Sequence, residues 1–134
     1  MITKEDVESY LDRVAAEGAT YREIEPGLWV VRPGGALDLD VVVSYSPPVV
    51  VIRVKVMTIP ENDERCAGLN RRLLELNATD LIHGSYGIEA DAIVLTEALE
   101  LSHLDFDEFL ATYESMTMAL TSHLRELVTY REDR

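Results

Sequence analysis

The amino-acid sequence predicts an α+β fold in which an antiparallel β-sheet packs against helices. Three segments carry apolar residues at helical spacing, and six shorter segments carry them at period 2 or as β-branched runs. Proline, glycine and acidic residues separate consecutive strand candidates, as is typical of hairpins. The expected order is α-β-β-β-β-α-β-β-α, and the 134 residues fit a single domain spanning residues 1–134.

The first helix is expected to begin after Thr3, because Asp6 stands three residues later in the spacing of a capping box. Gly18 offers a stop for this helix. Two short strands should follow at about residues 21–24 and 28–32, separated by a turn that contains proline and glycine. They are expected to form a small antiparallel ribbon.

Two amphipathic strands are expected next, over residues 37–43 and 49–56, and Tyr45-Ser46-Pro47-Pro48 should connect them. Alternate residues are apolar in both strands, which places one face of each strand in the core. The residues predicted for the core faces are Leu37, Leu39, Val41, Val43, Val50, Ile52, Val54 and Val56.

A four-residue turn, together with core faces that coincide, predicts a register for the hairpin. This register places Asp40 opposite Arg53 and Asp38 opposite Lys55, so that opposite charges pair across the strands. Each such cross-strand pair contributes about 0.2–1 kcal/mol. Pairing of Asp40 with another residue would contradict this register.

The second helix is expected to begin with Pro60, which suits the first helical position, and to end at Asn77. Acidic residues cluster in its first turn, where the helix dipole favours them. Its buried stripe should consist of Cys66, Leu69, Leu73 and Leu76.

Another hairpin and a long helix complete the predicted fold. The strands are expected at about residues 81–88 and 92–101. The helix should begin near Asp105, with Glu108 at capping-box spacing, and run to about Tyr130. The remaining C-terminal residues are expected to fray. The long apolar stripe of this helix is typical of a helix packed across a sheet.

Composition narrows the possible partners. The chain has 12 basic and 25 acidic residues, for a net charge of −13, and this charge argues against nucleic acid and anionic membranes as partners. Residues 80–108 contain eight acidic residues and no lysine or arginine, which indicates either a solvated face or a docking patch for a basic partner.

The sequence also favours a cytoplasmic location. No apolar run is long enough to cross a bilayer, and the acidic amino terminus is unlike a signal peptide. The single cysteine, Cys66, has no second cysteine in the chain with which to pair, which agrees with a reducing compartment.

The sequence contains no catalytic signature. Ser85 lacks the spacing of a nucleophile elbow, and Cys66 lies on an apolar helical stripe. His103 is followed by Asp105 and Glu108, but helix capping already accounts for these two acids. We therefore expect neither enzymatic activity nor a cofactor or metal site.

Candidate contact residues come from two places. Trp29, in a ribbon strand beside Tyr21, is explained most simply as a half-buried residue, yet it is also the best single candidate for a contact. The strand over residues 49–56 has an outward face that mixes valines with basic residues on an otherwise acidic protein. The predicted protein-binding residues are Trp29, Tyr21, Val49, Val51, Arg53, Lys55 and Asp91.

Two stretches of sequence resemble the YbjN family, whose domains share the α/β sandwich of type III secretion chaperones such as the Tir chaperone. They are "VVVIRVKVMTIPEN" and "LNRRLLELNATDLIHGSYGIEADAIVLTEALEL", and the matching order of elements covers nearly the whole chain. The resemblance implies a non-enzymatic protein that forms homodimers and binds segments of other proteins.

Two classes of function follow from these observations. The favoured hypothesis is a chaperone-like or regulatory protein-binding module that receives a partner segment on a strand edge or an apolar patch. The alternative is a small-molecule-sensing or enzymatic domain that uses a cleft beside His83 and His103. A closed core without a pocket near either histidine would dismiss this alternative.

Overall fold

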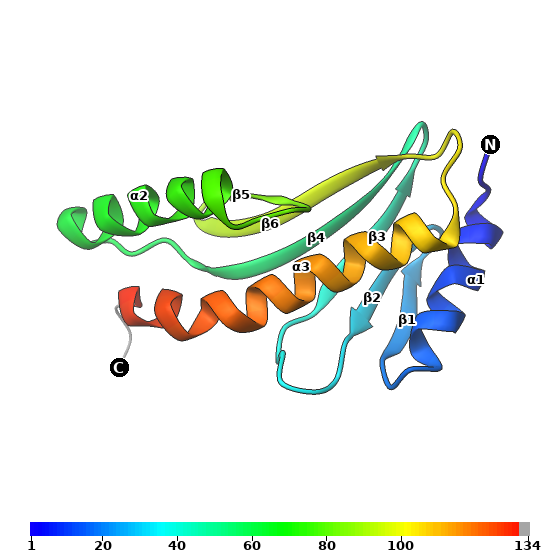
Figure 1. Ribbon diagram of the computed structural model, residues 1–134, viewed down its shortest axis with the longest axis horizontal. Helices are drawn as coiled ribbons and strands as arrows, with labels where there is room; N and C mark the ends of the chain where they lie inside the picture. Colours follow the sequence, from blue (N-terminus) through cyan, green and yellow to red (C-terminus); the bar gives the residue numbers. More distant parts are fainter. Residues whose placement is uncertain (132–134) are drawn as a thin grey trace.

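The computed structural model describes residues 1–131 and contains a six-stranded antiparallel sheet with three α-helices (Figure 1). The sheet order is β1-β2-β3-β4-β6-β5, so β6 inserts between β4 and β5. The elements are α1 (Lys4–Ala15), β1 (Thr20–Glu25), β2 (Leu28–Arg32), β3 (Val41–Ser46), β4 (Val49–Thr58), α2 (Asp63–Thr79), β5 (Ser85–Glu89), β6 (Ala92–Glu100), α3 (Phe106–Leu127) and the 3₁₀-helix η1 (Val128–Tyr130).

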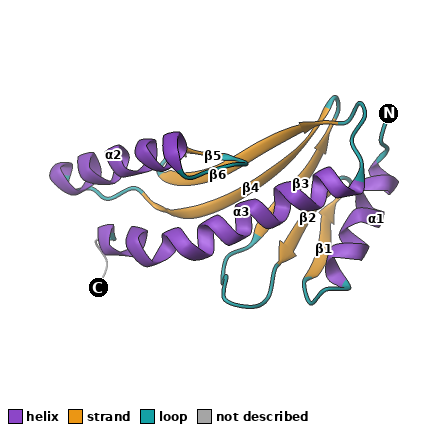
Figure 2. Cartoon of the chain, viewed as in Figure 1, coloured by secondary structure: helices purple, strands orange, loops and turns teal. Residues whose placement is uncertain are grey.

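This arrangement confirms the predicted α+β class and the predicted order of elements. Helices α1 and α3 lie across one face of the sheet, while α2 lies beside the edge strand β5 and reaches the end of α3 (Figure 2). The buried residues of all three helices join one hydrophobic core with the inner face of the sheet. None of the helices within residues 1–131 is long and apolar enough to cross a membrane.

Side-chain caps explain where the helices begin. Thr3 and Asp6 form the predicted capping box at α1, and the Asp105 side chain accepts a hydrogen bond from the Glu108 backbone at α3. The predicted start of α2 at Pro60 is wrong, because Asn62 caps the helix instead by accepting from the Arg65 backbone.

The C-terminal ends of α2 and α3 also differ from the predicted ends. Helix α2 passes through the predicted terminator Asn77 and ends at Thr79. Helix α3 ends at Leu127, and η1 continues the chain to the predicted limit at Tyr130. Fraying was predicted for the C-terminal residues, of which 132–134 lie outside the described residues.

The predicted core faces of the central hairpin are correct, but its register is not. Val42 lies opposite Arg53, and Ser46 lies opposite Val49, so the turn contains only Pro47 and Pro48. The shift relative to the prediction is two residues, which leaves the residues of both strands on their predicted faces because the side-chain period is also two. Leu37 and Leu39 were predicted within the first of these strands but lie in the loop before β3.

The predicted pairs of Asp40 with Arg53 and of Asp38 with Lys55 are therefore wrong. Strand β3 begins only at Val41, so both aspartates lie in the preceding loop. Arg32 at the end of β2 contacts both of them, with Nη1 2.8 Å from Asp38 Oδ1 and Nε 3.2 Å from Asp40 Oδ1. An exposed ion pair contributes too little free energy to fix the register of a strand.

Candidate functional site

The outward face of β4 carries the strip that the sequence analysis selected. Val49, Val51 and Arg53 are half-buried and Lys55 is exposed. The residues between them are buried in the core. The alternation follows from the period of a β-strand. We call these four residues the outer strip, and the structure brings them together on the face opposite to the helices.

Neighbouring strands widen the outer strip. The register places Val42 and Thr96 on either side of Arg53, and it places Ser44 and Ala98 on either side of Val51. Across β2, Val30 lies beside Val42 and is also half-buried. The outer face of the sheet therefore presents partly exposed valines over several adjacent strands.

Two cations near this face have no acidic partner. Arg53 forms an ion pair with Glu89 of β5, and Arg32 is engaged by two aspartates. In contrast, Lys55 and Arg22 make no ion pair with any of the described residues. The face is thus amphipathic, with Lys55 and Arg22 as its unpaired cations within residues 1–131 and with the exposed Glu100 opposite Val49 at one end of the strip.

Trp29 is not an exposed or half-buried contact residue. Its side chain is completely buried, and the register places it between Glu23 and Val43 on the inner face of the sheet. The prediction of a half-buried position is wrong because α3 and α1 cover this part of the ribbon. Its Nε1 atom finds no hydrogen-bond partner within residues 1–131.

Tyr21 connects the ribbon to the first helix. Its hydroxyl donates a hydrogen bond to the Asp12 carboxylate of α1, and this bond, with burial, raises the pKa of Tyr21 to about 12. Asp91 lies apart from both the outer strip and Tyr21, in the exposed turn between β5 and β6. Of the predicted contact residues, the structure groups only the four on β4.

An apolar patch that the sequence analysis missed lies beside α2 and β5. Leu74 of α2 is 67% exposed, Ile88 of β5 is 57% exposed, and Ile82 in the connection between them is 84% exposed. Leu74 and Ile88 line a hollow of about 320 Å³. We call Leu74 and Ile88 the α2–β5 patch. Leu74 lies outside the buried stripe of α2, and this departure is the sequence signal that could have identified it.

The Asn77 side chain forms hydrogen bonds with the backbone at the edge of β5. Its side-chain amide donates to the Tyr86 carbonyl at 3.1 Å, and its Oδ1 accepts from the Tyr86 backbone N–H at 2.7 Å. An edge strand normally leaves such groups free to pair with another strand. The side chain that the sequence suggested as a helix terminator therefore acts as a hydrogen-bond partner for the sheet.

A polar cluster of the buried Tyr86 and His123 with the exposed Asp80 connects β5, α3 and the end of α2. The Tyr86 hydroxyl lies 2.7 Å from His123 Nδ1, and His123 Nε2 lies 2.5 Å from Asp80 Oδ2. Burial raises the pKa of Tyr86, so its hydroxyl keeps its proton. The Tyr86 hydroxyl can donate to His123 Nδ1 while the Nε2–H of His123 donates to Asp80. His123 has no role in the sequence predictions, because it lies far from the other histidines in the sequence and suggests no motif.

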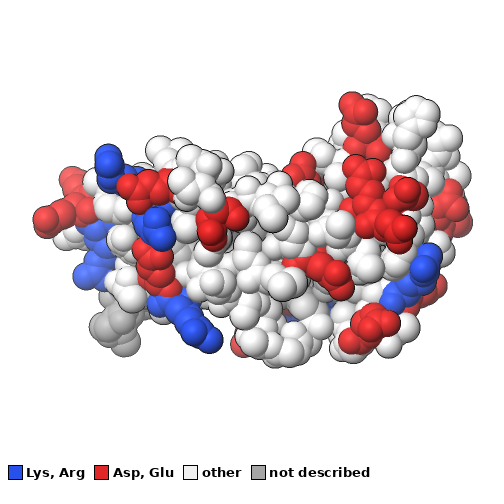
Figure 3. All heavy atoms as spheres, in the orientation of Figure 1, with Lys and Arg blue, Asp and Glu red and all other residues white. Residues whose placement is uncertain are grey.

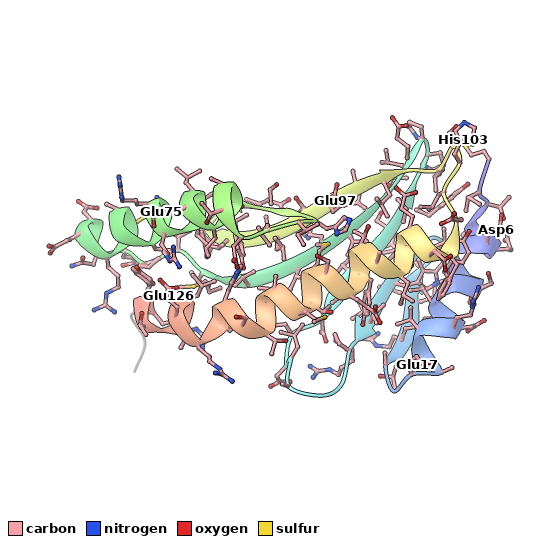
Figure 4. All side chains as sticks on the ribbon, viewed as in Figure 1. Asp6, Glu17, Glu75, Glu97, His103 and Glu126 are labelled. Carbon is pink, nitrogen blue, oxygen red and sulfur yellow. The ribbon has the colours of Figure 1, made fainter. Side chains whose placement is uncertain are left out.

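The cleft beside His83 and His103 exists. Both histidines line a cavity of about 530 Å³ together with Glu97, Glu100 and Glu108. Figure 4 shows Glu97 over the sheet and His103 in the connection from β6 to α3. His83 Nδ1 is buried without a partner among the described residues. The described part of the chain contains no group of three potential ligands arranged to hold a metal ion.

Charged side chains are unevenly distributed over the visible face of the molecule. Figure 3 shows lysine and arginine gathered mainly at the end formed by α2 and the last turns of α3, with acidic residues at both ends. Several of these cations are already paired: Arg72 Nε lies 2.6 Å from Glu126 Oε2, and Arg71 lies 3.3 Å from Glu75. This end is therefore less basic than its arginine content suggests.

Solved structures share this fold at low sequence identity. A chain of the heterodimeric ExoU–SpcU complex from the type III secretion system of Pseudomonas aeruginosa has a TM-score of 0.68 and 15% identity, and the match covers 94% of this chain and 98% of that chain. YbjN from E. coli has a TM-score of 0.65 at 11% identity, with 93% of each chain covered. A chain of the ExsC–ExsE complex has a TM-score of 0.56 at 14% identity, covering 95% and 97%.

The sequence itself also matches a protein family. No curated protein matches the chain. The CesT_Tir_1 family model, however, matches residues 2–133, which is nearly the whole sequence. The chain therefore belongs to the CesT_Tir_1 family, a family of type III secretion chaperones.

Proposed function

We propose that this protein is a non-enzymatic, chaperone-like or regulatory module that acts in the cytoplasm as a homodimer and binds a segment of another protein. Family membership supports a protein-binding chaperone, and two of the similar solved structures are complexes of two proteins. The whole of residues 1–134 would act as one domain. The observation that carries the proposal is the outer strip, an amphipathic surface on the face of the sheet opposite to the helices.

The outer strip suits an extended segment that alternates apolar and acidic residues. Apolar side chains of the segment would cover Val49 and Val51, while a carboxylate would pair with Lys55, which lacks an ion-pair partner among the described residues. Burying the valines contributes favourable free energy, and the charge pair selects the orientation of the segment. The Arg53–Glu89 pair would border the bound segment.

Affinity purification from the native cell, followed by mass spectrometry, tests this surface. We expect partners recovered with the unmodified protein to be lost with Val51→Asp and with Lys55→Glu. Arg125→Glu is the matched control, because it makes the same charge reversal on exposed α3 surface. Equal recovery with all variants would show that the outer strip is not the binding surface.

The α2–β5 patch is the proposed homodimer contact. Leu74 and Ile88 are both largely exposed and line one hollow, and adjoining exposed apolar residues mark interaction sites. Two copies related by a two-fold axis would cover each other's patches, as closed dimers require.

Light scattering at micromolar concentration tests the dimer. We expect a dimer for the unmodified protein and a monomer for Leu74→Asp. Ile24→Asp is the control, because Ile24 is also exposed, on β1 and outside the patch. A monomeric unmodified protein would contradict the proposed dimer, and a dimeric Leu74→Asp variant would contradict the proposed contact.

The cleft beside His83 and His103 supports a second candidate function, the binding of a small molecule. Its volume of about 530 Å³ falls in the range of ligand pockets. Mass spectrometry of compounds released from natively purified protein tests this candidate. A compound that is retained by the unmodified protein and lost in His103→Ala would support it, while the absence of any retained compound would argue against it.

A further inference from the structure

One histidine connects three elements that are distant in sequence. Tyr86 of β5 is 6% exposed and His123 of α3 is 5% exposed. Their ring centroids lie 5.7 Å apart, and the Tyr86 hydroxyl lies 2.7 Å from His123 Nδ1. The other ring nitrogen of His123 contacts Asp80, the C-cap residue of α2. We call these three residues the polar cluster.

In the neutral state of His123, every donor in the polar cluster meets an acceptor. Burial, and then the nearby charge of Asp80, raises the pKa of Tyr86, so its hydroxyl keeps its proton and donates it to His123 Nδ1. Nδ1 can accept only while it carries no proton of its own. The proton of the neutral ring is then on Nε2 and is donated to the Asp80 carboxylate.

Protonation of His123 would remove the acceptor that the Tyr86 hydroxyl uses. Both ring nitrogens would carry a proton, and Nδ1 would become a donor toward the hydroxyl oxygen. The Tyr86 hydroxyl has no other hydrogen-bond partner within residues 1–131. Its proton would therefore lack an acceptor in a buried position, which favours opening of the contact.

Asp80 acts in the opposite direction, because its negative charge stabilises a protonated ring. Its side chain is 57% exposed, however, and water screens such a charge. A positive charge in a buried position also costs free energy. We therefore expect the loss of the Tyr86 hydrogen bond to outweigh the attraction of Asp80.

Other charged groups on the surrounding elements are paired or exposed. Arg72 of α2 pairs with both Glu75 of α2 and Glu126 of α3. Glu89 of β5 pairs with an arginine of β4 on the outer face of the sheet. Arg125 of α3 is exposed. The response of the ring to pH therefore depends mainly on the polar cluster itself.

The polar cluster also adjoins the α2–β5 patch. Tyr86 lines the same hollow as Leu74 and Ile88, and the Asn77 side chain holds its backbone. A movement of β5 away from α3 would therefore change this hollow. An effect of pH on the dimer rests on the proposed function, whereas the movement of β5 does not.

We propose that the polar cluster is a pH-sensitive latch, which holds β5 against α3 while His123 is neutral and releases β5 when His123 is protonated. Histidine is the side chain that most readily changes charge between pH 5 and 8. The released state gains population as pH falls, because a released His123 binds the proton that the latched His123 excludes. The latched state dominates at the upper end of this range.

Hydrogen exchange measured by mass spectrometry at about pH 7.5 and about pH 5.5 tests the latch. Rates are expressed as protection factors, so that the intrinsic dependence of exchange on pH cancels. Protection of the β5 amides should fall about fivefold or more on acidification, while β2, the internal control, changes less than about twofold. Protection of β5 that is unchanged or higher at the lower pH would overturn the latch.

Tyr86→Phe separates the latch from a general effect of acid. The substitution removes the hydroxyl and, with it, the hydrogen bond that depends on the charge of His123. The pH dependence of β5 protection should therefore be lost. His103→Gln is the matched control, because it removes an exposed histidine outside the polar cluster, and here the pH dependence should persist. An equal pH dependence in Tyr86→Phe and the unmodified protein would overturn the role of the hydroxyl.

Leu74→Asp distinguishes failure of the latch from failure of the proposed dimer. This substitution disrupts the proposed dimer contact and leaves the polar cluster in place, so the pH dependence of β5 protection should remain. Its loss in Leu74→Asp would show that pH acts through the dimer contact, and would overturn the latch. A monomeric unmodified protein that keeps the pH dependence would support the latch and contradict only the dimer.

Discussion

The two faces of β4 differ although both are rich in valine. On the inner face, Val50, Ile52 and Val54 are completely buried under the helices. On the outer face, Val49 and Val51 stay half-buried and lead to Arg53 and Lys55. The same residue type therefore stabilises the fold on one face and remains available for a partner on the other. Substitutions on the inner face should therefore reduce stability, and substitutions on the outer face should reduce partner binding.

The largest loss of stability should come from the inner face, at Trp29. Trp29→Ala removes a completely buried side chain, and such changes cost about 3–5 kcal/mol in free energy of unfolding. Urea unfolding followed by circular dichroism measures this loss. A loss below about 1 kcal/mol would contradict the burial of Trp29.

Adjacent residues of β4 provide the sharpest test of the comparison. Ile52→Ala should cost about 2–5 kcal/mol because it leaves a cavity under α3, whereas Val51→Ala should cost less than about 1 kcal/mol. The two variants are compared by urea unfolding under the same conditions. Equal losses would show that the outer face is packed as tightly as the inner face.

Asn77→Ala should have an intermediate effect. The change removes both hydrogen bonds to the Tyr86 backbone and leaves these groups unpaired at the edge of β5. An unsatisfied buried group costs about 1–3 kcal/mol. Hydrogen exchange should report faster exchange of the Tyr86 amide, with little change in β2 as the internal control. Unchanged exchange at Tyr86 would show that Asn77 does not protect this edge.

The smallest effect on stability is expected at Lys55. Its ammonium group is exposed and has no ion-pair partner within residues 1–131. Lys55→Ala should therefore change the free energy of unfolding by no more than about 0.5 kcal/mol, while it weakens partner binding. Calorimetry and partner recovery together measure the two effects. A large loss of stability would place Lys55 among the structural residues.

The sequence predicted the architecture because helical and strand periodicity reflect burial directly. The core faces of β3 and β4 were correct even though the register was wrong, since a shift of two residues preserves every face. The error arose from the assumed four-residue turn, whereas Ser46 pairs with Val49 and the turn contains only Pro47 and Pro48. The weak charge pairs expected from that turn could not correct it, and both aspartates contact Arg32 instead.

The candidate surfaces were less predictable because they depend on packing between distant elements. Strand period was enough to identify the outer strip. It could not show that Trp29 is covered by helices, or that Leu74 and Ile88 lie at one hollow. The contact between Tyr86 and His123 is also invisible in sequence, because the two residues lie on separate elements 37 positions apart.

Site-specific photo-crosslinking tests the central claim most directly. A photoreactive amino acid at position 51 would lie on the outer strip, and the same amino acid at position 128 would lie on exposed η1 surface as a control. The proposed function predicts that position 51 crosslinks a partner protein in the native cell and that position 128 does not. A partner captured at position 128 with none at position 51 would contradict the assignment of the outer strip as the binding surface.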